Sequence, residues 1–219
     1  MAGKEEDTIN DIKQDIIHDL VELGEHVKVS IDRAVISLKE QDTSMADKVI
    51  GSKKEINDMG NAIEDKCTRG MTLKVSPLQL RTFKGILKMI IDLESIFSLA
   101  VEISLITKVT YLTPHIKPLV DIPRMSDQLQ EMMDGSFVAL KNQDVELAKS
   151  TALKDNDIDA LFDQIRRELI TYMMEDPKKI TNASHLTFVA RYLERMGDHV
   201  NNLCESVVYI VTGEKVDLN

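Results

Sequence analysis

The segment INDIKQDIIHDLVELGEHVKVSIDRAVISL, residues 9–38, carries an apolar side chain at every third or fourth position. The apolar positions of this series are Ile9, Ile12, Ile16, Leu20, Leu23, Val27, Ile31, Val35 and Leu38. An α-helix turns once in about 3.6 residues, so this spacing places all of these side chains on one helix face. The segment therefore predicts a long amphipathic helix that packs its apolar face against other helices.

Breaks in the pattern divide the rest of the chain into further helical segments. They fall at 42–44, Ser76-Pro77, 114–123, 142–144 and Asp176-Pro177. Ser76-Pro77 is typical of a helix start, because serine caps a helix and proline suits its first turn. We expect helices over 5–40, 44–72, 77–111, 121–142, 145–175 and 180–212. No stretch shows the sustained alternation that is typical of strands.

The last three of these helices repeat the pattern of the first three. Shifting the sequence by 102 residues aligns Ala46 with Ala148 and Ile56 with Ile158, and a shift of 100 aligns Leu93-Glu94 with Leu193-Glu194. The expected fold is therefore all-α, with two tandem antiparallel three-helix bundles related by a pseudo-repeat. The repeats are expected over 1–113 and 114–219, joined by the proline-containing stretch 114–123.

Charge and hydropathy argue against several kinds of partner. The 219 residues include 37 acidic and 27 basic ones, a net charge of −10, and no lysine or arginine run is longer than two. Such a chain repels nucleic acid and anionic lipid, so neither is an expected partner. The most apolar stretch, 86–101, is interrupted by Lys88, Asp92 and Glu94, so no membrane insertion is expected.

The two cysteines and the N-terminus indicate an intracellular protein. Cys67 and Cys204 lie far apart and outside any Cys-x-x-Cys motif, so both are expected to be reduced thiols. The first seven residues are polar and acidic, unlike a signal peptide. We therefore expect a cytoplasmic location.

Four carboxylates and one amide in the second half form the candidate metal site. Asp155 and Asp159 lie four residues apart in one predicted helix, Glu194 and Asp198 lie four apart in the next, and Asn202 follows one turn later. This spacing stacks oxygen atoms on one helix face, where like charges repel unless a cation neutralises them. Hard cations, and Fe or Mn in helical bundles, take such ligands. The alternative is a solvated acidic face, because a pair of acids four residues apart is a weak motif.

Motifs of the common enzyme classes are absent from the sequence. It contains no G-x-S-x-G, P-loop, H-E-x-x-H or dinucleotide-binding fingerprint, and no histidine stands in a Glu-x-x-His pattern. His199 follows Asp198 directly, but one residue is a rotation of about 100° on a helix, so an interface or surface position is expected for it. These absences favour a non-enzymatic protein.

The string FVARYLERMGDHVNNLCE, residues 188–205, closely resembles the LERxGDHxxN signature of the PhoU family of phosphate-uptake regulators. The segment KDNDIDAL, residues 154–161, resembles the family's fifth-helix motif. The first half agrees more loosely, in ADKVI at 46–50 and in the Leu93-Glu94 pair. With the duplicated six-helix layout, the resemblance extends over nearly the whole chain.

The resemblance implies a function and a set of partners. It implies a negative regulator, or adaptor, of phosphate uptake and phosphate-starvation signalling that links the ATPase subunit of a phosphate ABC transporter to a sensor histidine kinase. Such a protein would associate peripherally with the membrane through these partners, and a homodimer is one assembly to test. The alternative function is a metal-binding helical bundle with a redox or metal-storage role.

The resemblance also implies metal ligands, because some members hold metal clusters on paired acidic motifs. On this sequence the matching residues are Asp155, Asp159, Glu194 and Asp198, with Asn202 alongside, and the metals to consider are Fe, Zn, Ni, Mn and Mg. The equivalent positions of the first repeat are Lys53, Asn57, Glu94 and Ser98. These offer one negative and one positive charge, so we expect a metal in the second repeat only.

Overall fold

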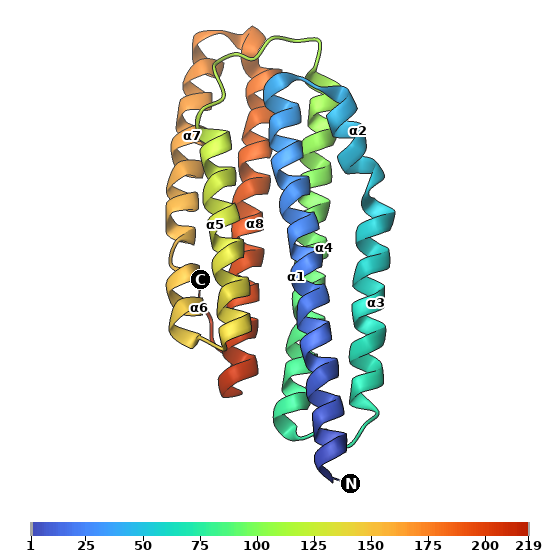
Figure 1. Ribbon diagram of the computed structural model, residues 1–219. Coiled ribbons are helices and arrows are strands. Elements are labelled where there is room, and N and C mark those ends of the chain that lie inside the picture. The colour runs from blue at the N-terminus through green and yellow to red at the C-terminus, as the bar shows by residue number, and fades with distance from the viewer. Residues whose placement is uncertain (1, 219) are drawn as a thin grey trace.

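A computed structural model describes residues 2–218, with the backbone alone described for residues 2–8. All of its regular elements in this range are helices: α1 (Ala2–Glu40), α2 (Thr43–Gly51), α3 (Lys53–Met71), α4 (Pro77–Thr110), α5 (Asp121–Asn142), α6 (Val145–Ala152), α7 (Asp155–Glu175), the 3-10 helix η1 (Pro177–Lys179) and α8 (Ile180–Thr212). The predicted all-α fold is confirmed. Figure 1 shows the long helices aligned along one direction, with the segment between α4 and α5 crossing one end of the molecule. Residues 1 and 219, the outer limits of the predicted repeats, lie outside the described residues.

The predicted helix over 44–72 is interrupted at Ser52, and the one over 145–175 is interrupted between α6 and α7. Ser52 and Lys154, which flank α3 and α7, both keep right-handed helical dihedrals and provide no side-chain cap. Each break is therefore a local change of helix direction with right-handed dihedrals, beside Gly51 in the first half and with no adjacent proline or glycine in the second. The two breaks fall at matching places in the two halves of the chain.

The pseudo-repeat is visible in the turns that precede α2 and α6. Gln41 and Gln143 have left-handed φ angles of 56° and 55° and end the helices before them. In each case an aspartate follows as the N-cap: Asp42 Oδ1 accepts the Ser44 and Met45 N–H groups, and the Asp144 side chain accepts the Leu147 N–H. The same glutamine–aspartate turn thus starts the second helix of each half.

The helix start predicted at Ser76-Pro77 is confirmed. The Ser76 hydroxyl accepts the Gln79 N–H at 3.3 Å, and the Gln79 side chain accepts the Ser76 N–H at 2.8 Å. Pro77 is the first residue of α4. This reciprocal capping fixes where α4 begins.

The two groups of helices, α1–α4 of the first half and α5–α8 of the second, share one hydrophobic core. Buried apolar residues from α1 to α8 form a single continuous cluster. α4 packs against α8, and α1 packs against α5, so each group contributes two helices to the contact between them. Phe137 of α5 sits directly over Gly24 of α1, where any Cβ atom would clash with the ring. The halves are therefore joined by close helix–helix packing.

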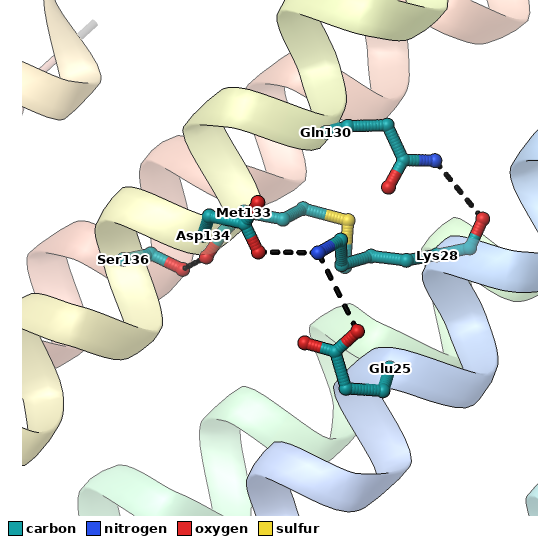
Figure 2. A network of polar contacts seen from close by, with 6 residues as sticks. All are labelled: Glu25, Lys28, Gln130, Met133, Asp134 and Ser136. Atoms are coloured by element: carbon teal, nitrogen blue, oxygen red, sulfur yellow. Dashed lines mark hydrogen bonds and ion pairs between the residues drawn. The ribbon is translucent and has the colours of Figure 1, made fainter.

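A polar network lies beside this contact and is drawn in Figure 2. The Lys28 ammonium, on a side chain only 14% exposed, forms ion pairs with Asp134 of α5 and Glu25 of α1. The Gln130 amide donates to the Lys28 carbonyl at 2.9 Å. The network thus adds directional contacts to the apolar packing of α1 on α5.

Among the described residues, none of the helices combines the length with the apolar content that crossing a bilayer requires.

Candidate metal centre

The structure brings the four predicted carboxylates together where α7 packs on α8. Asp155 is the first residue of α7 and Asp159 follows one turn later, while Glu194 and Asp198 lie in the middle of α8. Asp155 is 7% exposed and Glu194 is 8% exposed, whereas Asp159 and Asp198 lie nearer to the solvent. The cluster therefore has two buried and two more accessible acidic groups.

Asp155 is held by one hydrogen bond and by its fit against α8. Its Oδ2 accepts the Asn201 amide at 2.7 Å, and its Oδ1 is buried without a hydrogen-bond partner. Oδ1 lies so close to the Cα of Gly197 that a Cβ atom there would come closer than 3.0 Å. Gly197 is therefore required by space: any side chain at this position would displace the Asp155 carboxyl group.

Glu194 has one engaged and one free oxygen. Its Oε1 accepts a hydrogen bond from the Arg191 guanidinium, and its Oε2 is buried without a partner. The guanidinium also lies 5.8 Å from the centroid of the Phe162 ring on α7. Arg191 thus neutralises part of the charge at the outer side of the cluster.

Burial and mutual repulsion weaken the acidity of Asp155, Asp159 and Glu194. Burial raises the pKa of Asp155 to about 7, with further increases from the charges of Asp159, Asp198 and Glu194, while the Asn201 hydrogen bond lowers it. Burial also raises the pKa of Glu194 to about 7, opposed by Arg191. The pKa of Asp159 is raised by burial and by Asp198. The cluster consequently holds protons near neutral pH, or a cation in their place.

Asn202 does not join these carboxylates in the structure. Its amide donates to Asp92 Oδ1 of α4 at 3.0 Å, and His199 Nδ1 lies 2.9 Å from the same oxygen. The amide beside Asp155 belongs to Asn201, which the sequence reasoning missed. Seven residues are close to two helical turns, so Asn201 stays on the face of Glu194, whereas Asn202 is rotated away by about 80°.

The carboxylate oxygens of this cluster are the kind of ligand that a hard cation prefers, but they do not lie close enough together to coordinate one. Two buried carboxylate oxygens lack a hydrogen-bond partner, which is uncommon unless a ligand or water satisfies them. In the part of the chain that the structure describes, however, no three Asp, Glu, His or Cys side chains are grouped as a metal site. Binding a cation would require the side chains to close in, and Glu194 to loosen its contact with Arg191.

The equivalent region of the first half has a different composition. Lys53 and Asn57 are exposed, and the Ser98 hydroxyl donates to the Glu94 carbonyl of its own helix at 2.9 Å. Burial raises the pKa of Glu94, with a second increase from Glu64 of α3. Glu64 was not predicted as a site residue, because no acidic residue lies four positions before or after it in the sequence. The first half thus brings two acids together where the second has four.

Comparisons with known proteins agree with this architecture. The PhoU domain model matches residues 20–107 and again residues 122–207. The phosphate-specific transport system accessory protein PhoU homolog of Aquifex aeolicus is 36% identical over 198 residues, which cover 90% of this chain and 90% of the relative.

Solved structures give the same result. The crystal structure of PhoU from Pseudomonas aeruginosa superimposes with a TM-score of 0.88 and 30% identity, covering 94% of this chain and 99% of that one. The phosphate transport system regulatory protein PhoU from Streptococcus pneumoniae gives 0.86 and 27%, covering 95% and 99%. With its fold, its repeated motif and these similarities along nearly the whole chain, the protein belongs to the PhoU domain family.

Proposed function

We propose that this protein is a non-enzymatic regulatory accessory protein of phosphate transport. The observation that carries the proposal is family membership: the PhoU domain model matches both halves, and the similar proteins are named as accessory or regulatory proteins of phosphate transport systems. The sequence supports a non-enzymatic role, because it carries none of the common catalytic motifs.

We propose further that it acts as a negative regulator by linking the ATPase subunit of a phosphate ABC transporter to a sensor histidine kinase. An adaptor needs exposed surface for protein partners, and apolar side chains are exposed at one end of the molecule. Leu112 and Met174 are each 80% exposed, and Val109 and Val120 are 68% and 67% exposed. They come from the ends of α4 and α7 and from the segment joining α4 to α5, which meet at one end in Figure 1. A cytoplasmic location, peripheral to the membrane through these partners, belongs to this proposal.

The regulatory role is tested with a phosphate-starvation reporter in cells that lack the protein. Deletion should switch the reporter on at high phosphate, and the wild-type gene should switch it off again. A reporter that ignores the deletion would remove the main support for the proposal.

The adaptor role is tested by capture of the protein from phosphate-replete cells. The transporter ATPase and the kinase should be recovered, and the double variant Leu112→Asp, Met174→Asp should lose one or both. Val138→Asp, at a position 45% exposed on α5, is the matched control and should retain them. Light scattering of the purified protein decides between a monomer and a homodimer.

A second candidate function is cation binding by Asp155, Asp159, Glu194 and Asp198, with Fe, Zn, Ni, Mn and Mg as the metals to test and a redox or storage role as the consequence. It is favoured by the two buried carboxylate oxygens without partners and by the raised pKa values around them. Binding to the folded state at a hundredfold excess over Kd would stabilise it by about 2.7 kcal/mol. Neighbouring amide oxygens, from Asn201 or from a rotated Asn202, could complete the ligand set.

Thermal unfolding with each metal, together with metal analysis of the purified protein, tests this site. Asp198→Asn should reduce the metal-dependent shift in Tm, and Ser98→Ala, its counterpart in the first half, should leave it unchanged. The absence of any thermal response to the five metals would rule the site out, and equal effects of both variants would contradict its confinement to the second half.

A further inference from the structure

A cavity of about 200 Å³ lies away from the carboxylate cluster, between α4, α8 and the C-terminal segment. Its lining residues are Lys84, Lys88, Glu205, Tyr209, Lys215 and Val216. Half of these residues are lysines, in a chain that has ten more acidic than basic residues. The cavity is therefore a local concentration of positive charge on an acidic protein.

The packing of α4 on α8 positions four of the lining residues. Lys84 and Lys88 lie one turn apart on α4, and Glu205 and Tyr209 lie one turn apart on α8, so each helix presents two side chains on one face. The Lys84 ammonium lies 5.7 Å from the centroid of the Tyr209 ring. At this distance a cation–π interaction holds the Lys84 side chain toward Tyr209 of α8.

The chain after α8 brings the third lysine to the same place. Gly213 has a φ of 83°, a left-handed conformation that ends α8 and reverses the chain direction. The Leu218 N–H then donates to Glu205 Oε1 at 3.1 Å, and Val216 and Leu218 pack against the core. Lys215 lies between Gly213 and Val216, and it lines the cavity.

Among the described residues, the three ammonium groups form no ion pair with an acid. Other lysines of the chain do form such pairs, with acids such as Asp47, Asp58 and Glu146. Glu205 lines the cavity, but it accepts the Leu218 N–H and forms no ion pair with a lysine. Like charges gathered around one cavity repel each other, and an anion between them would relieve that repulsion.

We propose that this cavity binds a phosphoryl anion, either free phosphate or the phosphate group of a small ester. Lysine binds phosphate as a point charge, and the three lysines line the cavity from two sides, Lys84 and Lys88 from α4 and Lys215 from the C-terminal segment. A tetrahedral phosphate presents oxygens toward both sides at once, whereas a carboxylate presents two oxygens in one plane. Tyr209 also lines the cavity, and its hydroxyl group can donate a hydrogen bond. The inference depends on this cavity alone and would stand if the regulatory role were wrong.

Isothermal titration of the full-length protein at constant ionic strength tests the proposal. Inorganic phosphate, glycerol phosphate and vesicles containing phosphatidic acid separate the free ion, the small ester and the lipid headgroup, and acetate serves as the carboxylate. We expect the phosphoryl ligands to bind more tightly than acetate. The change of one lysine to glutamine, in Lys84→Gln, Lys88→Gln or Lys215→Gln, should weaken binding by about fivefold to tenfold.

Lys141→Gln is the matched control, because Lys141 is exposed on α5 and has no ion pair among the described residues. It should leave the affinity unchanged, and circular dichroism should show that all four variants keep their helices. The proposal is overturned if no phosphoryl ligand binds, if acetate binds as tightly as phosphate, or if Lys141→Gln weakens binding as much as the cavity variants do.

Discussion

At the scale of single residues, the Asp155 carboxyl group occupies a position that destabilises the folded protein when the group is ionised. It is almost fully buried, it faces three other acids, and one of its oxygens has no hydrogen-bond partner. Natural proteins keep such groups where a ligand or a proton compensates for them. The arrangement therefore predicts a measurable dependence of stability on pH.

The direction of that dependence follows from the raised pKa. The folded protein binds the Asp155 proton more tightly than the unfolded chain does, so ionisation destabilises the fold. In buffer that contains a chelator, stability should fall as pH rises from about 4 to about 7. At pH 8, urea unfolding should give Asp155→Asn a free energy of unfolding higher than that of the wild type by on the order of 2 kcal/mol. This difference should shrink toward pH 4. Asp157→Asn, exposed on the same helix, is the control, and equal effects of the two variants would contradict the argument.

A second prediction concerns the polar contact between α4 and α8. Asp92 is 8% exposed and receives hydrogen bonds from Asn202 and His199. Because removing one partner leaves a buried charge less satisfied, His199→Leu should cost about 1–3 kcal/mol in urea unfolding. The double variant Asp92→Leu, His199→Leu should cost less than the sum of the single changes. Strict additivity would show that the two side chains do not interact.

The same residues show where sequence reasoning about the site reached its limit. The four carboxylates could be predicted because each pair lies within one helix, where spacing alone fixes the face. Asn202 was grouped with them by adding another four residues, although successive steps of four drift around the helix. Its contact with Asp92 joins residues 110 positions apart, and no local pattern indicates such a pairing.

At the scale of helices, the sequence predicted most of the structure because helices are specified locally. The apolar stripes, the Ser76 cap and the aspartates at 42 and 144 lie within a few residues of what they determine. The breaks at Ser52 and Lys154 were not predicted, because both residues keep helical dihedrals, Gly51 beside Ser52 is only a weak signal on its own, and no proline or glycine lies beside Lys154. α2 packs on α1 and α4, and α6 packs on α5 and α8, so each short helix contacts two long helices of its own half.

Helix contacts that depend on close approach lead to the third prediction. Alanine is a better helix former than glycine by about 1 kcal/mol, so Gly24→Ala would stabilise α1 in isolation. In the folded protein its Cβ would clash with the Phe137 ring, and the net effect should be a loss of about 1–3 kcal/mol. Phe137→Leu should recover part of this loss in the double variant.

Gly51→Ala provides the control for this clash, because no atom lies within 4 Å of the Cβ position there. Thermal unfolding should show Gly51→Ala close to the wild type or slightly more stable. If Gly24→Ala were as stable as the wild type, α1 and α5 would be able to move apart enough to admit the methyl group without a loss in the free energy of unfolding.

At the scale of the whole molecule, the repeated sequence and the continuous core lead to different expectations about unfolding. Repeats suggest units that could unfold separately, as in proteins whose repeats contact only their neighbours. Here, however, α1 and α4 of the first half pack on α5 and α8 of the second, and one hydrophobic cluster spans both halves. Separating the halves would expose the apolar faces of four long helices to water, at a cost that grows with the area exposed. We therefore expect the two halves to unfold together.

The two cysteines test this directly, because one lies in each half. Cys67 of α3 and Cys204 of α8 are both fully buried, and burial raises the pKa of each thiol to about 12. Neither thiol can react with an alkylating reagent until its surroundings open, so each labelling rate reports the opening free energy of its own half. If the halves unfold as one unit, the two rates should give the same opening free energy and the same dependence on urea, followed by mass spectrometry of the separate peptides. A Cys67 that reacts at lower urea than Cys204 would show that the first half opens independently and that the contacts of α4 with α8 and α1 with α5 are weaker than their packing indicates.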